Sequence, residues 1–94
     1  MSVIPVAPVP NQMLSVQLGG QVCEIAIRQK PSGLYLTLWA DDVLIMSSIL
    51  CLNAVPMSVE YSKFPGSLMF FDMNGSSDPE YSGLGSRYQL RYEP

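Results

Sequence analysis

Acidic and polar residues alternate along residues 72–80, and this run is the first place in the chain to look for a ligand site. Its members recur at every second position and are Asp72, Asn74, Ser76, Asp78 and Glu80. Oxygen ligands at this spacing are typical of calcium loops, but an EF-hand also requires glycine at its sixth position and glutamate at its twelfth. Counted from Asp72, glycine falls at the fourth position and Gly83 occupies the twelfth. The EF-hand template therefore fails, which leaves two interpretations open: a cation site of another kind, or a solvated turn shaped by Asn74-Gly75 and Asp78-Pro79.

The glycines that follow this run do not form a phosphate loop. Gly83-Leu84-Gly85 would need a third glycine three residues later, where the sequence has Tyr88, and a helix whose N-terminus faces the anion. No lysine follows, and the next segment has the pattern of a strand. We therefore interpret the two glycines as shaping a tight loop.

Other residue types with catalytic or ligand chemistry are scarce. The chain has no histidine, so the commonest general base and metal ligand are missing. Cys23 and Cys51 are too few for a zinc site. A disulfide between them would imply an oxidising compartment, and reduced, buried cysteines are the favoured interpretation.

The remaining carboxylates form no catalytic constellation. Asp41-Asp42 reads as a solvent-facing turn, while Glu24 and Glu60 are isolated in strand-like segments. An enzyme that uses Asp78 and Glu80 as acids would need a pocket that the sequence does not indicate. We predict neither catalytic residues, metal ligands nor a cofactor.

Composition bounds the class of protein. Ninety-four residues are enough for one domain. Of these, 48% are hydrophobic and only 14% charged, against a usual charged share of about 25%. The apolar excess predicts a surface that faces a partner, although a fully packed two-layer core is the alternative. The net charge of −3 and the scattered basic residues argue against nucleic-acid binding.

No targeting segment is recognisable. The N-terminus carries no positive residue, and its apolar run is interrupted by Pro5, Pro8 and Pro10. The longest apolar run, residues 43–52, is about half of the roughly 20 residues that span a bilayer.

Period-two alternation from Met13 onward predicts short antiparallel strands. We predict strands over residues 14–18, 23–28, 34–40, 67–73 and 86–92, with turns at Gly19-Gly20, residues 30–33 and Asp41-Asp42. Residues 43–52 have mixed periodicity, so a bulged strand and a short helix both fit, and we favour a strand. Residues 53–66 read as a connection with a short pairing segment around Val59 and Tyr61.

These elements predict an all-β fold, a small antiparallel β-barrel or sandwich of five to seven strands. Residues 1–11 are expected to form an extended, proline-rich N-terminal arm, and residues 12–94 a single β domain. In the last strand, Tyr88, Leu90 and Tyr92 should share one face. Arg87, Gln89 and Arg91 should share the other, as a charged seam against a partner or as the polar face of an edge strand.

Taken in order, the motifs resemble a known family. The chain opens with "IPVAPVPNQ" and continues through a glycine-turn hairpin ending "IAIRQ" to "GLYLTLWADD". It closes with "GSLMFFDMNGSSDPEYSGLGSRYQLRYEP". This order is similar to that of the small baseplate plug proteins of contractile-tailed bacteriophages. Residues 43–66 contain little that is diagnostic.

The resemblance implies a structural virion protein of β-barrel-like fold, without catalysis. It implies a plug in the tail baseplate that packs against tube, hub, spike or wedge subunits in a symmetric assembly. A homo-oligomer in the particle, no membrane association, and synthesis in the cytoplasm of the bacterial host are expected.

Eight residues are candidates for contacts with neighbouring subunits. They are Pro5, Pro8, Pro10, Tyr35, Trp39, Tyr81, Arg87 and Arg91. The alternative is a small β-type binding module that recognises a saccharide or peptide, with Tyr35, Trp39 and Tyr81 as its aromatic contacts.

Overall fold

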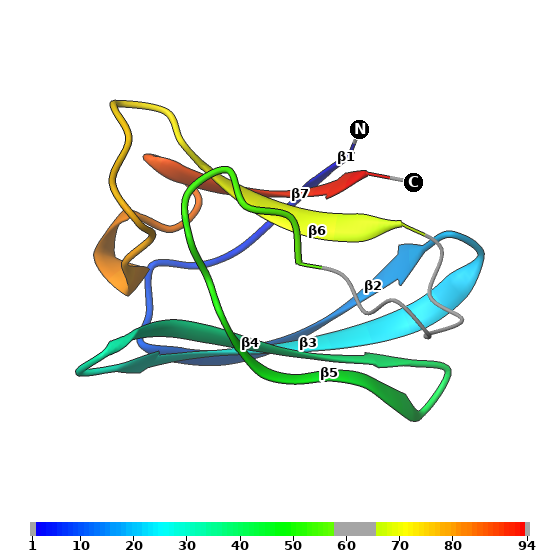
Figure 1. The fold of residues 1–94 in the computed structure, drawn as a ribbon. Helices are drawn as coiled ribbons and strands as arrows, with labels where there is room; N and C mark the ends of the chain where they lie inside the picture. Colours follow the sequence, from blue (N-terminus) through cyan, green and yellow to red (C-terminus); the bar gives the residue numbers. More distant parts are fainter. Residues whose placement is uncertain (1, 58–65, 94) are drawn as a thin grey trace.

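The fold is a sandwich of two antiparallel sheets, seen in a computed structural model that describes residues 2–57 and 66–93 (Figure 1). The smaller sheet has the order β1-β7-β6 and comprises β1 (Ser2–Ile4), β7 (Tyr88–Glu93) and β6 (Ser67–Asp72). The larger sheet has the order β2-β3-β4-β5 and comprises β2 (Asn11–Leu18), β3 (Gln21–Lys30), β4 (Gly33–Ala40) and β5 (Val43–Leu50). A short 3₁₀ helix, η1 (Tyr81–Gly83), precedes β7. The all-β prediction is confirmed, and of its two forms the sandwich is correct, because the sheets do not close into a barrel.

Two-residue turns connect the strands of the larger sheet where the sequence predicted them. Gly19 and Gly20 both have positive φ, 56° and 79°, which the primed turns of tight hairpins require. Asp41 and Asp42 adopt the same region, with φ of 49° and 66°. Asp41 also accepts a hydrogen bond from the Val22 N–H through Oδ1 at 3.0 Å. This bond ties the β4–β5 turn to the start of β3.

The ambiguous segment 43–52 is a strand, as favoured, and it is irregular. β5 pairs with β4 through two register shifts between Leu36 and Trp39. Ser48 has a φ of 49°, and its N–H donates to Thr37 Oγ1 at 3.0 Å. Such bulges bend a strand and interrupt its ladder, which explains why the apolar period is mixed here. The pairing predicted around Val59 and Tyr61 lies outside the described residues.

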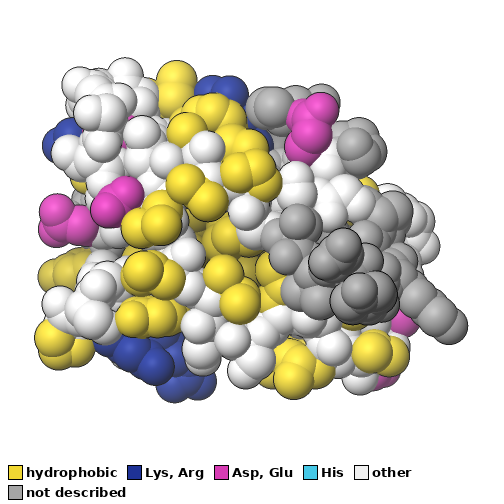
Figure 2. All heavy atoms as spheres, in the orientation of Figure 1, with side chains coloured by type: hydrophobic (Ala, Val, Ile, Leu, Met, Phe, Trp, Pro, Cys, Tyr) yellow, Lys and Arg dark blue, Asp and Glu magenta, His cyan; other side chains and the backbone are white. Residues whose placement is uncertain are grey.

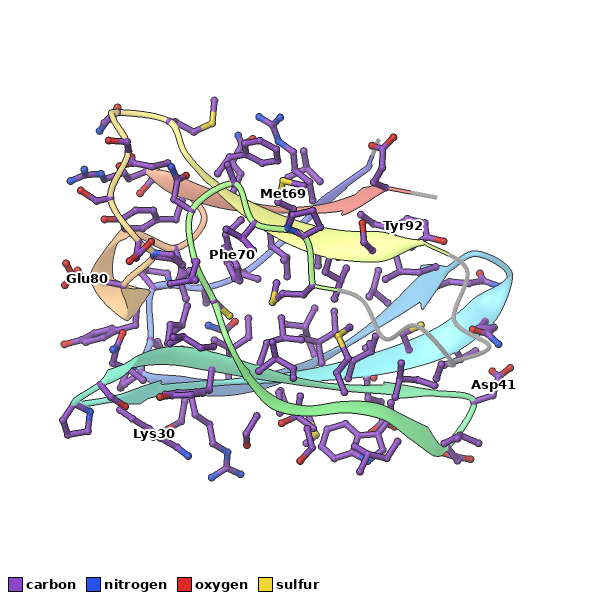
Figure 3. The ribbon with its side chains drawn as sticks, in the orientation of Figure 1. Lys30, Asp41, Met69, Phe70, Glu80 and Tyr92 are labelled. Carbon is purple, nitrogen blue, oxygen red and sulfur yellow. The ribbon has the colours of Figure 1, made fainter. Side chains whose placement is uncertain are left out.

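Alternate residues of both sheets fill the space between them (Figure 3). The larger sheet contributes Cys23, Ile25, Ile27, Leu34, Leu36, Leu38 and Ala40, and the smaller sheet Ile4, Leu68, Phe70, Tyr88, Leu90 and Tyr92. The predicted apolar face of the last strand is thus confirmed. Burying such side chains contributes roughly 1.5–3 kcal/mol each, so this interior is the main source of stability.

Both cysteines are buried free thiols, as favoured by the sequence. Burial raises the pKa of the Cys51 thiol to about 12 and also raises the pKa of Cys23. The thiolate is the reactive form of cysteine, so these side chains act as small hydrophobic groups.

The first residues of the proline-rich N-terminal segment belong to the packed sandwich, and the segment bends at residues 8–10. β1 pairs with β7 through Ser2–Tyr92, Val3–Arg91 and Ile4–Leu90, which brings the two ends of the chain side by side (Figure 1). Ile4 is only 2% exposed, and β2 begins at Asn11. A role for residues 1–11 as a docking arm stays a prediction. Within residues 2–57 and 66–93, no helix has the length and apolar character needed to cross a bilayer.

Candidate assembly surfaces

An ion pair closes the acidic loop between β6 and β7. Asp72 is the last residue of β6 and Arg87 directly precedes β7, so the antiparallel register brings their side chains together. Arg87 Nε donates to Asp72 Oδ1 at 2.8 Å and Arg87 Nη2 donates to Oδ2 at 2.9 Å. This bidentate geometry is the strongest that arginine offers a carboxylate. The Asp72 side chain is fully shielded from solvent, while that of Arg87 is 38% exposed.

Backbone groups complete the coordination of Asp72. Its Oδ1 accepts from the Asn74 N–H at 2.9 Å and its Oδ2 from the Ser77 N–H at 2.8 Å. The hydrogen bonds from Arg87 lower the pKa of Asp72 far below its ordinary value, and the same contact raises the pKa of Arg87. Asp72 is therefore an ionised clamp that shapes the loop, which fits the turn interpretation of this residue. No cluster of three potential metal ligands occurs in the described part of the chain.

The two glycines of the loop lie where it packs tightly. A Cβ on Gly83 would stand 2.7 Å from ring atoms of Tyr88. Gly85 has a φ of +84°, and a Cβ there would stand 2.5 Å from the Val6 carbonyl oxygen. The loop-shaping role predicted for these glycines is thus explained, and it connects the C-terminal loop to the N-terminal segment.

Tyr81 and the three prolines lie on the surface. The Tyr81 N–H donates to Gln29 Oε1 at 3.1 Å, and the residue is 38% exposed. Pro5, Pro8 and Pro10 are exposed. Their segment is held in place by Gln12, whose side-chain amide exchanges two hydrogen bonds with Ala7 at 3.0 and 2.7 Å.

Arg91 lies on the outer face of the smaller sheet. Its guanidinium carbon is 4.4 Å from the centroid of the Phe71 ring, a cation–π distance. Nε and Nη2 donate to Gln89 Oε1 at 3.2 and 3.0 Å. Val3, 59% exposed, faces Arg91 across the β1–β7 register. Of the two predicted arginines, Arg91 therefore contacts Gln89, whereas Arg87 is held in the loop by Asp72.

The outer face of the larger sheet carries two half-buried aromatic side chains, Trp39 and Tyr35, both predicted as contact residues. Trp39 on β4 lies between Glu24 on β3 and Leu44 on β5, and Leu44 is 53% exposed. Four residues earlier on the same strand, the Tyr35 hydroxyl and the Ser32 hydroxyl share a hydrogen bond of 2.8 Å. Lys30 Nζ lies 4.9 Å from the centroid of the Tyr35 ring.

Apolar side chains reach solvent on more than one side of the molecule. Figure 2 shows hydrophobic side chains in a band across the middle of one face, over β6 and the segment that follows β5. Among the residues that the structure describes, the large hydrophobic ones that are at least 39% exposed are Val3, Val9, Met13, Val22, Val43, Leu44, Leu50, Val55 and Met73. The composition predicted exposed apolar surface but not its position in the fold. Leu44 and Met13 were not among the predicted contact residues, because the face on which each lies follows from strand register and not from composition.

Comparison with known proteins identifies the family of this chain. The family model described as cyanophage baseplate Pam3 plug gp18 matches residues 1–94. A search of curated proteins finds no match. Because the family model covers the full length of the sequence, the chain belongs to the family of the cyanophage Pam3 baseplate plug gp18, a structural component of the phage tail baseplate.

Proposed function

We propose that this protein is a non-catalytic plug that packs against tube, hub, spike or wedge subunits in a symmetric baseplate assembly. The family match over residues 1–94 supports the setting. The observation that carries the contact surface is the apolar pair on the outer face of the larger sheet, where Leu44 is 53% exposed beside the half-buried Trp39. Large exposed apolar patches are uncommon on monomers and mark interaction sites.

Two features support a role without catalysis. The sequence has no histidine. Asp72, whose pKa the hydrogen bonds from Arg87 lower, has both oxygens occupied by Arg87 and by backbone N–H groups. Such a group stabilises a loop and is not free to transfer protons.

Leu44→Asp tests this surface, with Ser47→Asp as the matched control on the same strand. Both side chains are exposed, so neither change should unfold the isolated protein, which thermal unfolding would verify. In phage particles that carry the variants, we expect Leu44→Asp to lower the amount of this protein in purified tails at least tenfold. Ser47→Asp should leave it unchanged. Normal incorporation of a folded Leu44→Asp protein would refute the proposed contact surface.

A further inference from the structure

The four outer strands of the two sheets differ in how their open edges are protected. An unprotected edge strand is a template for pairing with another chain, and proteins block it with short length, charge, proline, bulges or a covering segment. β1 has three residues, and β5 is interrupted by two register shifts. β6 is covered by residues 53–57, where the Met57 N–H donates to the Leu68 carbonyl at 2.7 Å and the Met57 carbonyl accepts from the Leu68 N–H at 3.1 Å.

Within residues 2–57 and 66–93, β2 has none of these devices. Its eight residues, NQMLSVQL, include no charge and no proline, and the register with β3 runs from Asn11–Arg28 to Leu18–Gln21 without a shift. Within the described residues, β3 is the only strand that pairs with β2. It is thus a long, regular and uncharged edge.

The direction of its free backbone groups follows from the register. The Gln29 N–H donates to the Pro10 carbonyl at 2.8 Å, so the pair 10–29 is a hydrogen-bonded position of this ladder. Such positions alternate in an antiparallel pair. Even-numbered residues of β2 therefore bond to β3, and odd-numbered residues from Asn11 to Gln17 direct their N–H and C=O groups away from the sheet. No described residue bonds to these groups.

The interior is also less covered at this edge. The inward-facing residues Leu14 and Val16 of β2 are only partly buried, while Ile25 on the neighbouring β3 is 0% exposed. A strand added beside β2 would bury these side chains as well as satisfy the backbone.

We infer that β2 pairs antiparallel with β2 of a second copy of this chain, about a two-fold axis at Leu14. The outward groups span residues 11 to 17, so their midpoint is residue 14. This axis sets Met13 opposite Ser15 and Asn11 opposite Gln17 of the second copy, and each such pair exchanges two backbone hydrogen bonds. Leu14 meets its own symmetry mate on the inner face, and the sheets of the two copies join into one.

The sequence of β2 favours a second copy over an unrelated strand. Chains of net charge −3 repel each other, but no charged residue lies on β2 itself, so no like charges oppose each other along the seam. The alternation of apolar and polar residues in β2 is also compatible with pairing to a second β2, because the apolar Leu14 and Val16 point inward on both copies. This contact adds a self-association surface to the proposed assembly role. Only its biological setting rests on the proposed function, because the contact itself is tested on the purified protein.

The decisive variant is Ser15→Pro, with Ser15→Thr as its control. Proline removes an N–H that points away from β3, so the β2–β3 ladder keeps its bonds, whereas threonine keeps the N–H. By light scattering across a concentration series, we expect a mass of twice 10.3 kDa for the wild type and for Ser15→Thr. Ser15→Pro should be monomeric, with its fold checked by circular dichroism. If proline unfolds the chain, Met13→Lys is tested in its place. It would put like charges close together across the contact between the two β2 strands, and the exposed side chain leaves the β2–β3 hydrogen bonds intact.

Cysteine cross-linking tests the register. Leu14→Cys should give a disulfide-linked dimer on mild oxidation, because opposed residues at such a position have Cα atoms about 4.5 Å apart. Asn11→Cys should not, because it faces Gln17 of the second copy. A monomeric wild type, a folded Ser15→Pro or Met13→Lys protein that still dimerises, or cross-linking at position 11 in place of 14 would overturn the inference. None of these outcomes bears on incorporation into tails, which tests the proposed function separately.

Discussion

At the scale of single residues, two aspartates of the acidic run 72–80 hold the backbone in place. Asp72 binds Arg87 and two backbone N–H groups, and Asp78 Oδ1 accepts the Asn53 N–H at 3.0 Å. The alternation that looks like a ligand loop thus serves, at these two positions, to fix backbone turns. The sequence could not decide this, because Asp72 and Arg87 are fifteen residues apart and meet only through the β6–β7 register.

This clamp predicts how stability depends on pH. Folding lowers the pKa of Asp72, so the unfolded chain binds a proton at this carboxyl more readily. Its contribution is present above the unfolded pKa of about 3.9 and is lost as the pH falls from there toward the lower folded value. We expect Asp72→Asn to have a lower midpoint of thermal unfolding than the wild type at pH 7. The difference should shrink as the pH is reduced below 4.

The control is Glu80→Gln, which removes an exposed carboxylate from the same loop. Its unfolding midpoint at pH 7 should match that of the wild type, because exposed charges contribute little. An Asp72→Asn deficit that is equally large at pH 7 and at pH 2 would show that the effect comes from lost packing and not from the charge.

At the scale of elements, the loop before β7 and the segment after β1 support each other through Gly85. Gly85 and Gly20 both have positive φ, +84° and +79°, but only Gly85 faces another part of the chain, the Val6 carbonyl. A side chain in the left-handed region costs roughly 1–2 kcal/mol. We expect Gly20→Ala to lose about that much unfolding free energy and Gly85→Ala to lose more, because alanine there also displaces residues 5–7.

Denaturant unfolding measures both values, and hydrogen exchange locates the damage. In Gly85→Ala, faster exchange should appear in β1 and in residues 5–10, whereas Gly20→Ala should affect the β2–β3 hairpin. Equal losses in the two variants would mean that the contact with Val6 contributes nothing.

The strands themselves were largely predictable. Period two located β2, β3, β4, β6 and β7, and turn residues located their ends to within a few positions. β1 was not predicted, because three residues show no period and its pairing partner lies at the other end of the chain. The division of strands between two sheets was beyond the sequence for the same reason: it depends on long-range contacts and not on local pattern.

At the scale of the whole molecule, β1 fastens the two ends of the chain together and completes the smaller sheet. Ile4 is 2% exposed within the interior, whereas its neighbour Val3 is 59% exposed on the outer face. Within this short strand, Ile4 therefore has a structural role in the interior, whereas the adjacent Val3 is a surface residue. Truncating a buried isoleucine to alanine costs about 2–5 kcal/mol, a large part of the roughly 5–15 kcal/mol that stabilises a small domain.

We therefore expect Ile4→Ala to lower the free energy of unfolding by about 2–5 kcal/mol, and Val3→Ala to change it by less than about 0.5 kcal/mol. Urea titration followed by Trp39 fluorescence would measure both. If Ile4→Ala were as stable as Val3→Ala, β1 would be a detachable arm and the smaller sheet would stand without it. The expected result has a consequence for assembly experiments, because deleting residues 2–10 would then weaken the fold and the arm together. Substituting the exposed Pro5, Pro8 and Pro10 while keeping Ile4 is the change that isolates a docking role for this segment.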